Sequence, residues 1–249
     1  PNYLSASHNA HPNYARYLDD KKTLTVEDIN EIFDMMEESK RICFDQEYIE
    51  ALYIRYMETG RILEEHRVTL EERLKGKTVL LIAPGKSAIQ EQDKIVSFAA
   101  VNQVVSISVN FDYPGLETDY IFLSNLRRYR DFPQDKLYKS IITSNIPSDR
   151  AYLKTKYYDL LADEDAVRDN AGLMAIRFLI TNEVKEIYLA GFDGYSHNME
   201  ENYADNQMMM AGRATFWDAM NRGMSHVLQK YGEQVSIKFL TTPKYILGH

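Results

Sequence analysis

The sequence predicts an α/β fold, in which a mostly parallel sheet flanked by helices follows a helical segment at the N-terminus. The first observation is the stretch 78–89, where an apolar run stops at Pro84 and Gly85 and helix-compatible sequence follows. The second is a change of period near residue 77, where helical spacing of apolar residues gives way to short apolar runs separated by helical stretches. Strands separated by helices in this way are typical of βαβ units, whose strands are parallel.

The chain divides at this change of period. Residues 1–76 are expected to form a helical segment, with helices near 25–36, 45–58 and 61–75. The last of these helices is heavily charged, so we expect its surface to be solvated. Residues 77–249 are expected to form a Rossmann-like domain of the nucleotide-binding type.

Two residue types in the N-terminal segment bear on metal binding and redox chemistry. His8 and His11 have the spacing of a metal motif, but Pro12 interrupts a helix there and no carboxylate or cysteine completes a ligand set. We therefore interpret this stretch as a polar turn and expect no metal site. Cys43 is the single cysteine, which excludes an internal disulfide and suits a reducing cytoplasm.

The domain after residue 77 alternates strands and helices along its whole length. Strands are buried on both faces in parallel sheets, so they read as short continuous apolar runs. The predicted strands cover residues 78–83, 104–109, 120–123, 137–143, 186–190 and 235–240. The predicted helices cover about 87–100, 165–182 and 207–230.

The turn after the first strand is the first candidate for ligand binding. Gly85 lets the backbone approach a ligand, and Ser87 caps a helix whose free N–H groups suit a phosphate. Neither a GxGxxG nor a GxxxxGK[ST] motif is present. The alternative remains open that this turn, like many α/β turns with one glycine, binds nothing.

Charge and hydrophobicity exclude some classes of protein. The net charge of −8 argues against nonspecific nucleic-acid binding, so no nucleic-acid partner is expected. No apolar run approaches the roughly 20 residues of a membrane span, and the first residues lack the pattern of a signal peptide. We therefore expect a cytoplasmic protein without a membrane span. Because the chain starts at Pro1, we also expect it to be part of a longer protein.

Polar residues gather where the predicted strands end, and ligands of parallel sheets bind at that edge. Asn110 and Asn125 follow the second and third strands, and an asparagine offers both a donor and an acceptor to a base or a ribose. Four arginines have guanidinium groups that suit a phosphate. Arg127, Arg128 and Arg130 follow Asn125, and Arg168 lies at the start of the helix predicted over 165–182. Each residue has an alternative role, because asparagine also forms turns and arginines in a first helical turn are often solvated.

The same positions resemble a known family. Residues 79–87 are similar to the opening of the bacterial sialyltransferases of the Campylobacter type and of the related pterin-diphosphokinase-like domains. The stretch 168–174 resembles the family's Arg-x-Thr-Ser-Gly helix start, and residues 185–195 are the closest match. In that family these positions surround a cytidine nucleotide-sugar. The resemblance therefore implies a nucleotide ligand bound by Gly85, Ser87, Asn110, Asn125, Arg168, Asn170 and Gly172.

This sequence departs from the family at two positions. The asparagine of the family's first loop is Pro84 here. The family's catalytic histidine falls in the stretch 210–215, which contains Gly212 and Arg213 instead. Since Arg213 cannot accept a proton at neutral pH, sialyl transfer is not expected.

The N-terminal piece resembles a different family. Residues 3–15 are similar to the stretch that follows the barrel in aldolases of the hydroxymethylglutaryl-CoA lyase and hydroxyoxovalerate aldolase type, as carried in bacterial surface-polysaccharide clusters. The resemblance implies that an aldolase-like TIM barrel precedes this chain as a partner in cis. A divalent metal and the lyase chemistry would then belong to that barrel.

Three interpretations of function remain. In the first, the domain binds a nucleotide or nucleotide-sugar in making a cell-surface sugar, with Asp193 and Tyr195 on the acceptor side and His197 or Tyr195 as a candidate base. In the second, it is a catalytically silent domain for oligomerisation, including a homo-oligomer, or for partner binding. In the third, Asp193 with Asp112 or Asp119 holds a metal for phosphoryl transfer. An open cleft at the strand ends favours the first, and a filled one the second.

Overall fold

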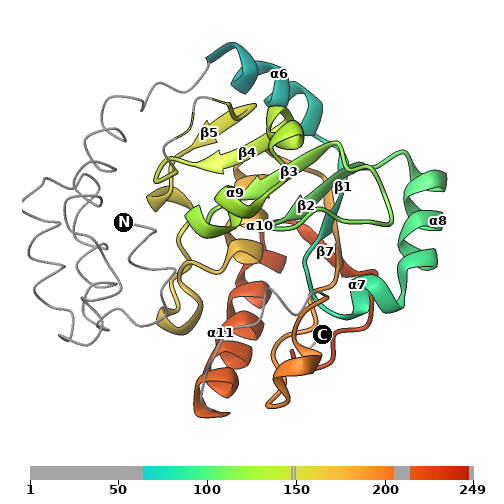
Figure 1. The fold of residues 1–249 in the computed structure, drawn as a ribbon, viewed down its shortest axis with the longest axis vertical. Helices are drawn as coiled ribbons and strands as arrows, with labels where there is room; N and C mark the ends of the chain where they lie inside the picture. The colour runs from blue at the N-terminus through green and yellow to red at the C-terminus, as the bar shows by residue number, and fades with distance from the viewer. Residues whose placement is uncertain (1–63, 147, 149, 205–213, 247–249) are drawn as a thin grey trace, which may run out of the picture.

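The computed structural model describes residues 64–146, 148, 150–204 and 214–246 (Figure 1). The predicted helices near 25–36 and 45–58, the His8–His11 pair and Cys43 lie outside these residues. So do residues 3–15 and 210–213, which carry the aldolase resemblance and part of the departure from the sialyltransferases.

A seven-stranded sheet forms the centre of the described residues, in the order β5-β4-β3-β2-β1-β6-β7. Every neighbouring pair is parallel, which confirms the predicted α/β fold. The strands are β1 (Thr78–Ile82), β2 (Val105–Val109), β3 (Tyr120–Leu123), β4 (Ser140–Thr143), β5 (Leu153–Thr155), β6 (Glu186–Ala190) and β7 (Ser236–Phe239). The edge strand β5 is the one that the sequence does not predict.

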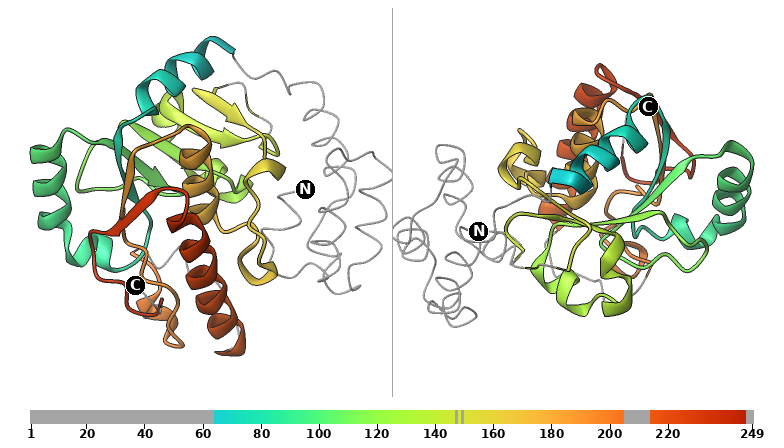
Figure 2. Two further views of the ribbon diagram at one scale, coloured as in Figure 1. Left: turned by 180° about the vertical axis from the view of Figure 1, so that it is seen from behind. Right: turned by 90° about the horizontal axis from the view of Figure 1, so that it is seen from above.

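Helices cover both faces of the sheet (Figures 1 and 2). The α-helices are α6 (Glu64–Leu74), α7 (Ser87–Gln90), α8 (Gln92–Asn102), α9 (Leu126–Asp131), α10 (Ala171–Thr181) and α11 (Ala214–Gly232). Short 3-10 helices are η1 (Gln134–Lys139), η2 (Tyr158–Leu160), η3 (Asp165–Val167) and η4 (Met199–Glu201).

Successive side chains of a strand point to opposite faces of the sheet, so alternate β1 residues pack into different cores. Val79 and Leu81 pack with apolar residues of α6, α10 and α11 on one face. Leu80 and Ile82 pack with Ala88 of α7 on the opposite face. A third cluster places α9 and η1 residues against β3 and β4. The sheet is therefore buried on both sides, as its continuous apolar strands require.

Three predicted elements differ from the structure at their boundaries. The helix predicted over 87–100 is broken at Glu91, whose φ of −109° and ψ of 28° are not helical. The strand predicted over 137–143 starts only at Ser140, because η1 precedes it. The helix predicted from 165 starts at Ala171, because Asn170 caps it there.

Helix α6 belongs to the packing of the sheet. Its Leu70 and Leu74 are fully buried in the core shared with α10 and α11. Its charged residues 71–73 are exposed, as its composition predicts. The division of the chain at residue 76 stays a prediction, because residues 1–63 lie outside the described part.

Within the described residues, no helix has the length and apolar character needed to cross a membrane.

Candidate functional site

The strand order places the topological switch point between β1 and β6, because the chain runs outward from β1 to β5 and then returns to β6. Ligands of such sheets bind in the crevice at this point. Here the loops after the two strands contact each other: the Gly85 N–H donates to the Gly191 carbonyl at 3.1 Å. A Cβ on Gly85 would lie 2.2 Å from that carbonyl oxygen. Gly85 therefore allows two backbones to approach closely, and the crevice is filled at this position.

Asp193 occupies the start of α7, where the sequence suggests a phosphate. Its carboxylate accepts a hydrogen bond from the Ser87 N–H at 2.8 Å and a second from the Ser87 hydroxyl. Ser87 Oγ also lies 2.8 Å from Thr241 Oγ1, which accepts from the Gly191 N–H at 2.9 Å. This network joins the loops after β1, β6 and β7. Burial raises the pKa of Asp193, although the hydrogen bonds from Ser87 favour the charged form.

The asparagines after β2 and β3 lie in adjacent loops. Asn110 has a left-handed φ of 59°, and its Oδ1 accepts from the Ser124 N–H at 3.3 Å. Asn125 Oδ1 accepts from the Arg128 N–H at 3.2 Å and so caps α9. Both side chains are partly exposed, and no described residue accepts a hydrogen bond from either Nδ2 group. Each of the two residues therefore uses its Oδ1 acceptor within the protein, and its Nδ2 donor stays unused.

Asn170 connects the start of α10 to the loop after β6. Its Oδ1 accepts from the Gly172 N–H at 3.0 Å and the Leu173 N–H at 3.2 Å, which caps α10. Its Nδ2 donates to the Tyr195 hydroxyl at 3.1 Å. The cap fixes the amide orientation, so Asn170 holds Tyr195 at the strand edge.

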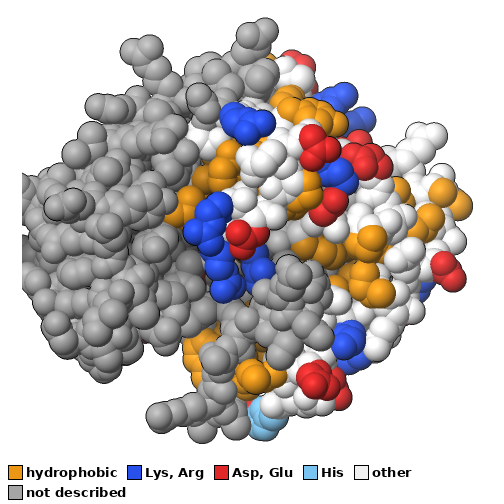
Figure 3. All heavy atoms as spheres, viewed as in Figure 1, with side chains coloured by type: hydrophobic (Ala, Val, Ile, Leu, Met, Phe, Trp, Pro, Cys, Tyr) orange, Lys and Arg blue, Asp and Glu red, His pale blue; other side chains and the backbone are white. Residues whose placement is uncertain are grey.

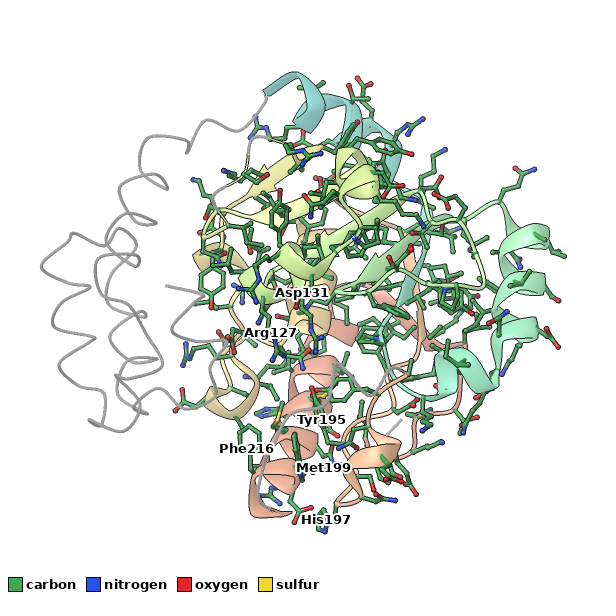
Figure 4. The ribbon with its side chains drawn as sticks, in the orientation of Figure 1. Arg127, Asp131, Tyr195, His197, Met199 and Phe216 are labelled. Atoms are coloured by element: carbon green, nitrogen blue, oxygen red, sulfur yellow. The ribbon has the colours of Figure 1, made fainter. Side chains whose placement is uncertain are left out.

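Tyr195, the partner of Asn170, lies near Tyr203, which interacts in turn with arginines of α9. The Tyr195 ring stacks on Trp217 with 5.2 Å between centroids and lies 6.3 Å from the Tyr203 ring. Burial raises the pKa of Tyr203, while Arg127 and Arg128 act to lower it. The two arginines are therefore within electrostatic range of the Tyr203 hydroxyl. Lys and Arg side chains gather over this part of the surface, and Arg127 projects from α9 there (Figures 3 and 4).

The predicted catalytic residues Asp193, Tyr195 and His197 have separate partners. His197 Nε2 lies 2.8 Å from Asp218 Oδ1 on α11, which gives the histidine an orienting partner that the sequence does not reveal. Both side chains are about half exposed, and His197 is the labelled residue farthest from α9 (Figure 4). Burial raises the pKa of the Tyr195 hydroxyl well above its usual value, which keeps it protonated at neutral pH. The three side chains do not form one catalytic group.

Arg168 and Gly172 lie near the start of α10 with different roles. Arg168 pairs with Asp165 at 2.7 Å and lines a pocket of about 770 Å³ between η3 and α11. A Cβ on Gly172 would lie 2.7 Å from the ring of Phe192, so this glycine lets the loop after β6 pack on α10. Whether either residue binds a ligand stays a prediction.

The carboxylates considered for a metal are engaged elsewhere. Asp112 pairs with Lys136 at 2.7 Å, and Asp119 accepts from the Ser106 N–H and hydroxyl, each at 2.8 Å. In the part of the chain that the structure describes, no group of His, Cys, Asp and Glu is arranged as a metal site.

Two residues join the set that the sequence predicts. Tyr203 has no local signal in the sequence. Asn145 follows β4 after a serine, as Asn125 follows β3 after Ser124, and its Nδ2 donates to the Ser124 carbonyl at 3.4 Å. Searches of family models, curated proteins and solved structures find no match to this chain.

Proposed function

We propose that the described domain binds a nucleotide or nucleotide-sugar at the ends of β2 and β3, beside α9 and the start of α10. One observation carries the proposal: Asn110 and Asn125 are each held by their own acceptor and keep an unused Nδ2 donor, and the exposed Arg127 follows Asn125 by two residues. Ligand sites characteristically combine a few convergent polar groups of this kind with apolar or aromatic surface.

The chemistry of these groups defines the ligand. Two amide donors require acceptors on the ligand, such as ring nitrogens, carbonyl oxygens or sugar hydroxyls. The guanidinium of the exposed Arg127 suits the phosphate. Tyr203, which interacts electrostatically with Arg127 and Arg128, and the neighbouring Tyr195 supply aromatic surface. A nucleotide combines these features in one small molecule.

The position of the candidate base favours binding without group transfer. A general base must lie within hydrogen-bond reach of the acceptor hydroxyl. His197 has an orienting carboxylate, but it lies away from α9 (Figure 4). We therefore propose a binding domain that transfers no sialyl group. Its wider setting, the carboxyl-terminal part of an aldolase-like lyase in making bacterial surface polysaccharide, rests on the sequence resemblance alone.

A substitution that keeps the helix cap tests this site. Serine caps helices about as well as asparagine, so Asn125→Ser should fold like wild type while losing the amide donor. Isothermal titration calorimetry with nucleoside mono- and diphosphates should show affinity reduced about tenfold, or about 1.4 kcal/mol. The matched control is Asn102→Ser, since Asn102 is an exposed asparagine of α8. Equal affinities for all three proteins would refute the assignment of Asn125.

The role of Arg127 is tested by a matched pair of substitutions on α9. Arg127→Gln should weaken binding most at low ionic strength, because salt screens exposed charges. Arg130→Gln removes the same charge from the same helix, but Arg130 pairs with Asp131. The proposal requires a larger effect at position 127 than at 130.

A second function is favoured by the filled crevice. Gly85, Ser87 and Asp193 bond to one another or to Gly191, as expected of a domain without a ligand at the switch point. In this alternative the domain is catalytically silent and binds a partner or a second copy of the chain. Absence of binding to every nucleotide, with a chain that sediments as an oligomer, would favour it.

A further inference from the structure

Asn145 is a buried amide with an unused acceptor. Its side chain is 7% exposed, and its Oδ1 has no hydrogen-bond partner. Its Nδ2 bond to the Ser124 carbonyl is 3.4 Å long, beyond the usual range for such a bond. Because a buried polar group without a partner is costly, a side chain this poorly satisfied needs an explanation.

Asn145 belongs to the same edge as the proposed site. The backbone of Ser124 bonds to two asparagines: its N–H donates to Asn110 and its carbonyl accepts from Asn145. The next residue is Asn125. Ser124 therefore connects three amides that follow the neighbouring strands β2, β3 and β4.

The three amides offer different groups. Asn110 and Asn125 keep their donors, whereas Asn145 keeps its acceptor. The Asn145 acceptor is buried, so it meets a ligand only after the side chain turns, and the hydrogen bond given up in that turn is the long one to Ser124.

We propose that Asn145 is a specificity-determining residue of the nucleotide site, whose acceptor receives a hydrogen bond from the exocyclic amino group of a base. This inference rests on the proposed function. Cytosine and adenine place an amino donor beside a ring-nitrogen acceptor, which complements the Asn145 acceptor together with an Asn110 or Asn125 donor. The same bases without the amino group leave the Asn145 acceptor unpaired.

Matched pairs of nucleotides isolate this one group. Calorimetry would compare AMP with purine riboside 5′-monophosphate and CMP with 2-pyrimidinone riboside 5′-monophosphate, which lack the amino group and keep the ring-nitrogen acceptor. Wild type should bind the amino member of each pair about tenfold more tightly. Asn145→Leu, similar in size but without an acceptor, should bind both members of a pair equally. Asn145→Ala, which also lacks an acceptor, serves the same purpose if the leucine variant fails to fold.

Thr143→Val is the matched control. Thr143 Oγ1 is also buried without a partner, two residues before Asn145 on the same strand end. Its replacement should leave the amino preference intact. A second readout needs no ligand: since Asn145→Leu removes an unsatisfied group, its melting temperature should equal or exceed that of wild type.

The outcomes separate this inference from the function on which it rests. Wild type that binds nucleotides with equal affinity with and without the amino group refutes the role of Asn145 and leaves the site standing. An amino preference that survives in Asn145→Leu, or in Asn145→Ala where the leucine variant does not fold, also overturns it. Wild type that binds none of the four nucleotides refutes the site and the inference together.

Discussion

Replacing Gly85 by alanine should destabilise the protein severely. The new Cβ would lie 2.2 Å from the Gly191 carbonyl oxygen and 2.9 Å from Asp193 Oδ2, and real Cβ atoms essentially never approach within 3.0 Å. Neither neighbour moves freely. The Gly191 carbonyl accepts from Gly85 itself, and the Asp193 carboxylate is held by Ser87. Relief of the clash must therefore separate the loops after β1 and β6.

The cost follows from two effects. Overpacking a well-packed region costs about 1–3 kcal/mol. Separation of the loops also loses the hydrogen bond from Gly85 to Gly191, about 1 kcal/mol. We expect a decrease of about 3 kcal/mol in the free energy of unfolding, a large part of the 5–15 kcal/mol that typical proteins have.

Urea unfolding followed by Trp217 fluorescence measures this effect. Trp217 is the single tryptophan and is 1% exposed, so its emission reports loss of the core. The control is Gly232→Ala at the end of α11, where an added Cβ meets no atom within 4 Å. Gly232→Ala should not destabilise the protein. A Gly85→Ala variant as stable as this control would show that the crevice is open and would restore Gly85 as a ligand-facing residue.

Three further predictions concern stability and its dependence on pH. Because burial raises the pKa of Asp193, the contribution of its protonated form to stability is full below the unfolded value near 4 and is lost as pH rises through the folded pKa. The unfolding free energy of wild type relative to Asp193→Asn should therefore fall over that range. A difference that does not depend on pH would contradict this. Tyr195→Phe removes the partner of Asn170 Nδ2 and should cost about 1 kcal/mol in urea unfolding, whereas an unchanged midpoint would mean that this bond contributes nothing. Leu74→Ala should lower the free energy of unfolding by about 2–5 kcal/mol, because Leu74 is fully buried. Val68→Ala on the same helix should lower it hardly at all, because Val68 is half exposed. Equal effects would place α6 outside the core.

The central strands could be predicted because burial on both faces gives them continuous apolar runs. The stretches that form β1, β3 and β6 read Thr-Val-Leu-Leu-Ile, Tyr-Ile-Phe-Leu and Glu-Ile-Tyr-Leu-Ala. Strand β5 reads Leu-Lys-Thr, which is too short and too polar for this signal. Helix α9 has six residues and three arginines, so its apolar residues show no period. Local burial patterns therefore reveal the centre of the sheet better than the edge strand β5.

The site was harder to predict because its decisive contacts are distant in sequence. The prediction that Ser87 caps a helix is wrong: Lys86 is at the N-cap position of α7 without a side-chain cap, and Ser87, the first residue of the helix, bonds to Asp193, which is 106 residues away. Asp218, which orients His197, is 21 residues away. No local pattern selects one carboxylate among many for such a contact. Asn145, in contrast, follows the predicted strand by two residues, so the strand-end rule that selects Asn125 selects it too.

Side-chain amide resonances of the asparagines test the central claim most directly. A two-dimensional ¹H–¹⁵N spectrum of the labelled protein, recorded while a nucleoside diphosphate is added, reports on each Nδ2 group. The account predicts that the signals of Asn110 and Asn125 shift with one saturable dissociation constant. The signals of Asn102 and Asn182, which donate to backbone carbonyls within or at the end of their own helices, should stay in place. Saturable binding that leaves Asn110 and Asn125 unchanged would contradict the account.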